Sequence, residues 1–146
     1  MPTIQPLALS AADQQTVQTL NAVKAKIGMI PNLFATLANS PAALHGYLQL
    51  SETLGSGRLN ARQREIVALS VAQENACQYC LSAHTAIGKG AGLSEADIRS
   101  ARAGNGADAM SNAIAVLARK VVQKRGRLNS EDLEDARHAG VTDGVI

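Results

Sequence analysis

Aromatic side chains are almost absent from this sequence. Its 146 residues include one Phe, two Tyr and no Trp, together 2% of the chain. Proteins that bind single-stranded nucleic acids usually stack the bases on aromatic side chains. The chain also lacks a block of basic residues, since 14 Lys and Arg are spread against 12 Asp and Glu. The composition therefore argues against nucleic-acid binding.

Cysteine is also scarce, with two residues in the chain. Two cysteines do not make the disulfide framework of a small secreted domain. The first residues, MPTIQPLALSAADQQ, lack the basic start and the apolar run of a secretory signal. We therefore expect a cytoplasmic protein in a reducing compartment.

An apolar run long enough to cross a membrane is missing as well. Residues 27–51 contain no Asp, Glu, Lys or Arg, but Pro31, Pro41 and His45 interrupt this uncharged segment. A membrane-spanning helix needs about 20 consecutive apolar residues. We therefore expect no membrane association, and we predict that the segment is buried in the core or against another subunit.

Alanine, in contrast, is abundant, with 26 residues. Because alanine loses no side-chain entropy in a helix, this composition favours packed helices. No segment alternates with the period of a strand, and helix start and stop residues recur along the chain. At this length the sequence predicts one all-α domain over residues 1–146. The expected helices run from Ser10 to about Ile27, over 32–38, from 41 to about 55, from about 61, and over about 77–88, 95–103, 110–125 and 130–139.

Reactive side chains are concentrated at Cys77, Cys80 and His84. If a helix begins near Cys77, Cys80 lies one turn inside it, where the helix dipole favours a thiolate. His84 follows four residues later on the same face, close enough to exchange a proton. Cys77 lies within disulfide range of an oxidised Cys80. These are the parts of a thiol peroxidase cycle, in which a thiolate becomes a sulfenic acid and then condenses with a second thiol.

We predict Cys80 as the nucleophile and Cys77 as the resolving thiol, because His84 is placed to pair with Cys80. The reverse order is common in thiol–disulfide oxidoreductases, so the spacing alone leaves the order open. Two other interpretations use the same residues. The cysteines and His84 could be three ligands of a structural zinc ion in a binding module that is not an enzyme, with His45, His138 or a carboxylate as the fourth ligand. The cysteines could also be buried and inert.

Two carboxylates are candidates for a proton relay to the cysteines. Glu65 and Glu74 are nine residues apart and so lie on opposite sides of a helix, which means that only one can face the thiols. Glu65 precedes the apolar run 66–72, where burial would favour the neutral carboxyl used in proton transfer. Glu74 adjoins a loop. For Glu65 by itself, a structural ion pair with Arg62 or with another Arg is at least as good an interpretation as catalysis.

The pattern Glu65-x11-Cys77-x2-Cys80-x3-His84 resembles the alkylhydroperoxidase D-like (AhpD-like) family within the carboxymuconolactone decarboxylase superfamily. The resemblance extends to the segments 28–34, 59–62, 68–72 and 92–94 and covers about two-thirds of the chain. It implies a compact all-helical bundle of the AhpD-like type, with the cysteine pair at the N-terminus of a central helix. It also implies homo-oligomers, often trimers or hexamers.

The resemblance further implies peroxide reduction in which Cys80 is peroxidatic, Cys77 is resolving, and Glu65 and His84 relay protons. The reductant would be a dithiol or a lipoylated partner protein, and no cofactor or metal ion is predicted. Founding members carry a His between the cysteines, where Tyr79 stands here. The alternative enzyme is a decarboxylase-like lyase that uses Glu65 and His84 as acid and base, although that branch of the superfamily generally lacks the cysteine pair.

Overall fold

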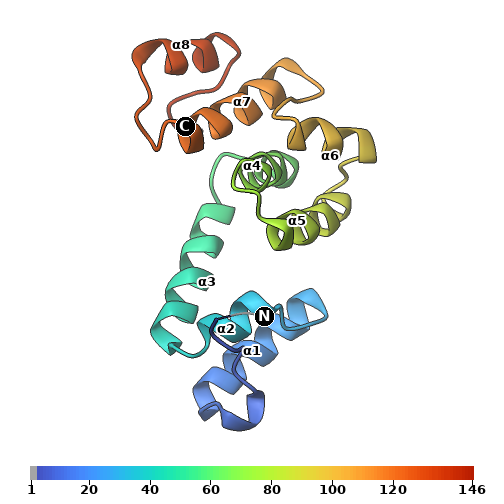
Figure 1. The fold of residues 1–146 in the computed structure, drawn as a ribbon, viewed down its shortest axis with the longest axis vertical. Coiled ribbons are helices and arrows are strands. Elements are labelled where there is room, and N and C mark those ends of the chain that lie inside the picture. Colours follow the sequence, from blue (N-terminus) through green and yellow to red (C-terminus); the bar gives the residue numbers. More distant parts are fainter. Residues whose placement is uncertain (1–2) are drawn as a thin grey trace. The chain divides into compact units, whose positions relative to one another are not determined.

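A computed structural model describes residues 3–146, and every regular element in that range is a helix (Figure 1). The prediction of an all-α fold is therefore confirmed. The chain divides into two compact units, the first ending at Ser56 and the second covering Gly57–Ile146. The prediction of one domain over residues 1–146 stays a prediction.

The first unit consists of a short 3-10 helix and three α-helices. Their bounds are Leu9–Ala11 for η1, Gln14–Ile27 for α1, Asn32–Leu37 for α2 and Pro41–Gly55 for α3. Leu20, Ala38 and Leu44 form the centre of its core. The uncharged segment 27–51 is buried only in part, because Met29 and Leu50 are exposed.

The start of α1 corrects one expectation. Asp13, and not Ser10, is the N-cap, because its carboxylate accepts the backbone N–H of Thr16 at 2.9 Å and the Thr16 hydroxyl at 2.7 Å. Ser10 lies instead in the 3-10 helix. A carboxylate that satisfies two donors is a stronger cap than a lone hydroxyl.

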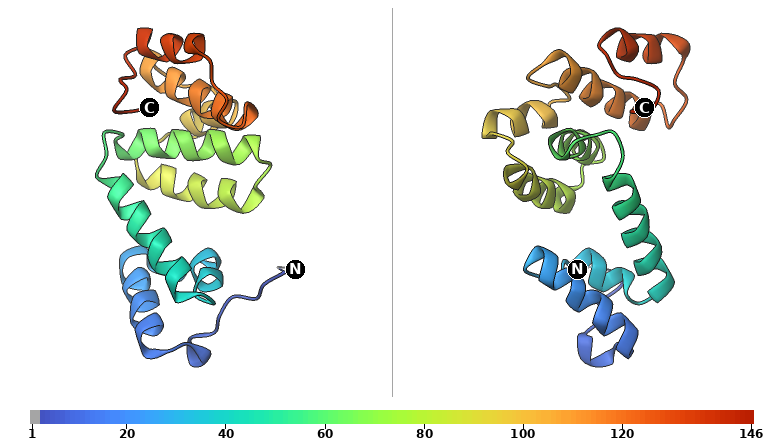
Figure 2. Two further views of the ribbon diagram at one scale, coloured as in Figure 1. Left: turned by 90° about the vertical axis from the view of Figure 1, so that its left-hand side faces the viewer. Right: turned by 180° about the vertical axis from the view of Figure 1, so that it is seen from behind.

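The second unit is built around α4, Ala61–Glu74, which packs against α5, α6 and α7 (Figures 1 and 2). The other helices of this unit are α5, Gln78–Gly90; α6, Glu95–Arg102; α7, Ala109–Gln123; and α8, Ser130–His138. Ile66 and Leu69 of α4 are buried against Leu81 of α5 and Ile98 of α6. Residues 66–72 of α4 are apolar on almost every side of the helix, and such a pattern predicts a central position.

Capping boxes begin three of these helices. Asn60 with Gln63 begins α4, Ser94 with Asp97 begins α6, and Asn129 with Asp132 begins α8. In each pair the two side chains satisfy backbone N–H groups that the first turn leaves without partners. These helix starts follow from residues three positions apart and agree with the sequence prediction. In the described part of the chain, no helix is long and apolar enough to cross a membrane.

Candidate active site

The turn between α4 and α5 sets the position of the cysteines. Cys77 is the N-cap of α5, where its Sγ accepts the backbone N–H of Cys80 at 3.2 Å. The turn is three residues long, so α5 runs back alongside α4 (Figure 2). The cysteine pair is therefore at the N-terminus of α5, while the most central helix of the unit is α4.

Cys77 and Cys80 form a disulfide, with 5.3 Å between their Cα atoms. Both residues are half-buried, whereas Gln78 and Tyr79 between them are exposed. The expectation that the two sulfurs lie within bonding distance is met. A disulfide across one turn at the start of a helix can be attacked by an external thiol without unfolding of the core.

His84 faces α4 from the next turn of α5. Its Nδ1 lies 2.8 Å from Oε2 of Glu65, and the side chains of His84 and Glu65 are 34% and 13% exposed. Gly88, one turn further along α5, is buried and faces Glu65. A β-carbon at Gly88 would lie 3.1 Å from Leu93 Cδ1 and 3.7 Å from Glu65 Cβ.

The other charged groups of α4 have partners elsewhere. Glu74 pairs with Nε of Arg119 on α7, at 3.2 Å. Arg62 pairs with Asp97 at 3.3 Å and also donates to the Gly92 carbonyl. Of the two carboxylates weighed from the sequence, the structure thus brings Glu65 to His84 on the cysteine-bearing helix and turns Glu74 toward α7.

Comparison with protein families adds an independent observation. Residues 41–124 match the sequence model of the family described as the carboxymuconolactone decarboxylase family. The matched segment includes all of α4 and α5. The chain belongs to the carboxymuconolactone decarboxylase family.

Two crystal structures resemble this member of the carboxymuconolactone decarboxylase family over nearly its whole length. One is an uncharacterized peroxidase-related protein of Ralstonia eutropha JMP134, described as an alkylhydroperoxidase AhpD core, with a TM-score of 0.83, 25% identity, and coverage of 98% of this chain and 80% of that one. The other is an uncharacterized peroxidase-related protein of Silicibacter sp. TM1040, with a TM-score of 0.83, 24% identity, and coverage of 99% and 80%. The fold is therefore AhpD-like. No match was found among curated proteins.

The two histidines outside the candidate active site are exposed. His45 is on α3 in the first unit, and His138 is the last residue of α8. Both were possible fourth ligands in the zinc interpretation. Within residues 3–146, no group of three or more His, Cys, Asp or Glu side chains is arranged to hold a metal ion.

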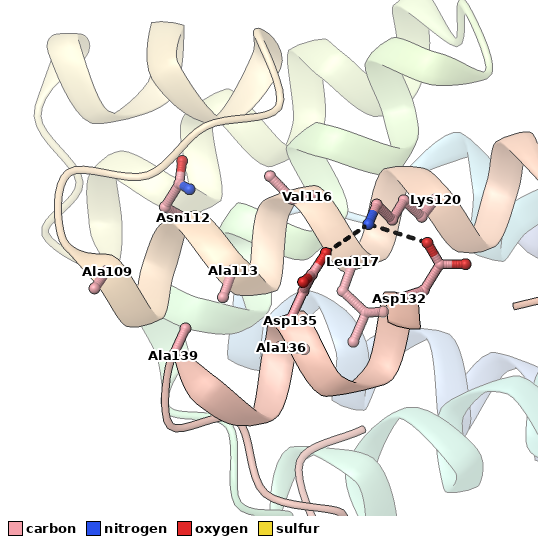
Figure 3. A pocket seen from close by; sticks show the side chains of 10 residues that line it. All are labelled: Ala109, Asn112, Ala113, Val116, Leu117, Lys120, Asp132, Asp135, Ala136 and Ala139. Atoms are coloured by element: carbon pink, nitrogen blue, oxygen red, sulfur yellow. Dashed lines mark hydrogen bonds and ion pairs between the residues drawn. The ribbon is translucent and has the colours of Figure 1, made fainter. Parts of the chain in front are cut away.

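Sequence reasoning missed a charged cluster between α7 and α8, at the edge of a groove of about 260 Å³ (Figure 3). Lys120 lies 3.0 Å from Asp132 and 3.3 Å from Asp135, and Lys124 also donates to Asp132. The Lys124 hydrogen bond, followed by the Asn129 N–H and Lys120, holds the pKa of Asp132 far below its usual value of 3.8. The hydrogen bond to Asp132 raises the pKa of Lys120. The capping box at Asn129 was the sequence signal that could have indicated this cluster.

Proposed function

We propose that the protein is a thiol peroxidase that reduces peroxides through Cys80 and Cys77, with Glu65 and His84 as a proton relay. The observation that carries the proposal is the disulfide at the start of α5, on the same helix as an imidazole that is hydrogen-bonded to a half-buried carboxylate. The description of two similar structures as peroxidase-related supports it.

In the first half of the cycle, the Cys80 thiolate attacks one oxygen of the peroxide. A sulfur–oxygen bond forms and the oxygen–oxygen bond breaks, so Cys80 is oxidised to a sulfenic acid and the peroxide is reduced to an alcohol or water. When Glu65 accepts from Nδ1–H, the imidazole of His84 keeps a lone pair at Nε2. That lone pair takes the proton of the Cys80 thiol. The hydrogen-bonded His84 and Glu65 then return the proton to the leaving oxygen.

In the second half, the Cys77 thiol attacks the sulfenic sulfur of Cys80. A sulfur–sulfur bond forms, and the hydroxyl of the sulfenic acid leaves as water with the Cys77 proton. The product is the disulfide of the described structure. A dithiol, or a lipoylated partner protein, then returns two electrons and two protons and is itself oxidised to a disulfide. Cys77 is the sulfur that this reductant attacks, since it precedes the first turn of α5.

The proposal includes a cytoplasmic homo-oligomer, a trimer or a hexamer. Tyr47, Leu50 and Leu54 on α3 are 43%, 59% and 62% exposed, and such side chains suit a contact between subunits. Light scattering should give the mass of three or six chains, and Leu50→Glu combined with Leu54→Glu should lower that mass. A single-chain mass for the unmodified protein would refute this part of the proposal.

The family description favours one second candidate, a lyase that uses Glu65 and His84 as acid and base. Such an enzyme needs no sulfur chemistry. A variant with both Cys77→Ser and Cys80→Ser separates the two candidates. If the protein is a lyase, the variant keeps its activity on a carboxylated lactone. If the thiol mechanism is right, the variant loses all peroxide consumption.

The decisive experiment is the mass of the reduced protein after one equivalent of hydrogen peroxide. We expect the loss of two hydrogens, located by proteolysis to a peptide that contains Cys77 and Cys80. Cys80→Ser should not form this product. A reduced protein that keeps both thiols and leaves the peroxide unconsumed would contradict the proposal, as would one bound zinc ion per chain whose removal is needed before the thiols react.

A further inference from the structure

A left-handed alanine immediately precedes the cysteine pair. Ala76 has φ 50°, a backbone conformation that is costly for a residue with a β-carbon and that glycine adopts freely. Its N–H donates to the Gln73 carbonyl at 3.0 Å, and the Cys77 N–H donates to the Ala72 carbonyl at 2.9 Å. These two hydrogen bonds form a Schellman motif, in which the left-handed residue is usually glycine.

The same pair of hydrogen bonds ends the other four helices of this unit. Gly92, Gly104 and Gly140 occupy the left-handed position after α5, α6 and α8. Within residues 3–146, Ala76 and Arg125 are the two residues other than glycine with positive φ, and Arg125, with φ 52°, occupies this position after α7. Of these two residues, Ala76 adjoins the cysteines, and Arg125 is followed by a second left-handed residue, Gly126.

Cys77 belongs to both helices at this turn. It is the last residue of the motif that ends α4, and it is the N-cap of α5. Its backbone is held on the α4 side through Ala76 and on the α5 side by the disulfide to Cys80. Ala76 and Gln78, on either side of Cys77, are both exposed. Covalent and backbone bonds therefore hold this turn more than side-chain packing does.

We propose that Ala76 is a positioning residue of the redox cycle, whose left-handed backbone opposes the closed turn of the disulfide form and favours the dithiol form. The inference rests on the proposed function, since it concerns the cycle of Cys77 and Cys80. The disulfide ties Cys77 to α5 and adds to the two backbone hydrogen bonds that hold Ala76 left-handed. Reduction removes the covalent part of this restraint, so the two hydrogen bonds can open, Ala76 can return to an ordinary φ and Cys77 can move away from Cys80. Part of the conformational cost then disappears on reduction, and an external dithiol reduces the protein more readily.

The test is the equilibrium between the protein disulfide and dithiothreitol, in which two electrons and two protons pass to the protein and dithiothreitol becomes its cyclic disulfide. Ala76→Gly removes one exposed methyl group, so it changes backbone preference and little else. We expect the equilibrium constant to move toward the protein disulfide by about fivefold, the factor that separates alanine from glycine in this conformation. The control, Arg125→Gly, should leave the constant unchanged.

Ala76→Asn gives a graded check, because asparagine tolerates the left-handed region better than alanine does and less well than glycine. It should move the equilibrium in the same direction by a smaller factor. Urea unfolding of both redox forms adds a second readout. Ala76→Gly should raise the unfolding midpoint of the disulfide form more than that of the dithiol form, whereas Arg125→Gly should raise both equally.

An unchanged equilibrium in Ala76→Gly, a shift of equal size in Arg125→Gly, or a shift toward the dithiol would overturn the role of Ala76. None of these measurements uses peroxide, so the two proposals fail separately. Unmodified protein that exchanges with dithiothreitol and consumes no peroxide refutes the peroxidase function alone. Unmodified protein that consumes peroxide, with variants at Ala76 and Arg125 that behave alike, refutes the role of Ala76 alone.

Discussion

Two pairs of neighbouring helices in the second unit each hold a carboxylate against a nitrogen, one at the proposed reactive site and one in the cluster between α7 and α8. Glu65 on α4 pairs with His84 on α5. Asp132 on α8 pairs with Lys120 on α7 and with Lys124, which follows the last residue of α7. Asp132, at 5% exposed, is more buried than Glu65, at 13%. Burial alone therefore does not distinguish the proposed reactive site from the α7–α8 cluster.

What differs is the partner of each carboxylate. Asp132 accepts from two ammonium groups and from the backbone N–H of Asn129, and these hydrogen bonds hold its pKa well below its usual value. Glu65 accepts from one imidazole, the side chain whose proton exchanges most readily near neutral pH. A saturated cluster stabilises a helix start, and a carboxylate with one exchangeable partner can pass a proton.

Replacing the nucleophile should have the largest effect and should separate the two regions completely. Cys80→Ser should reduce peroxide consumption, measured with a dithiol reductant, to the rate in buffer. Cys77→Ser should still consume one equivalent of peroxide and should then accumulate a sulfenic acid that dimedone traps. Full activity of Cys80→Ser would show that Cys80 is not the nucleophile.

Removing the charge of Glu65 should have the next largest effect. Glu65→Gln keeps the shape of the side chain and loses its ability to carry a proton, so the step with peroxide should slow by about a hundredfold or more. Stopped-flow measurement of a single turnover isolates that step. Glu74→Gln, a matched change on the same helix at the pair with Arg119, should leave the rate unchanged. Equal effects of the two substitutions would show that α4 acts only as a scaffold.

The smallest effect on chemistry should come from the α7–α8 cluster, where Asp132→Asn should change stability and leave turnover intact. Because the pKa of Asp132 is lowered from 3.8 in the folded protein, its ionised form stabilises the fold above about pH 4. That contribution declines as the pH falls through the folded pKa. The difference in urea midpoint between the unmodified protein and Asp132→Asn should therefore be full near neutral pH and shrink in acid. A difference that does not depend on pH, or a loss like that of the exposed control Glu134→Gln, would contradict this assignment.

Much of the fold could be predicted from short-range patterns. Asn60 with Gln63 and Ser94 with Asp97 begin helices where the sequence indicates, because a capping box needs only residues three positions apart. The same reasoning placed the start of α1 at Ser10 and was wrong, because two oxygens of Asp13 satisfy two donors of Thr16. The left-handed Ala76 had no sequence signal, since alanine gives no reason to expect positive φ.

The sequence by itself determined the helical class, most helix starts and the spacing of Cys77, Cys80 and His84, because helix hydrogen bonds and caps join residues only a few positions apart. The sequence also favoured Glu65 over Glu74, through the apolar run that follows Glu65 and through the family resemblance, but only the tertiary structure brings Glu65 within hydrogen-bond distance of His84. The hydrogen bond between His84 and Glu65 spans 19 positions in the chain and depends on how α5 packs against α4. That packing depends on the shapes of two helix faces in contact, which no local pattern describes.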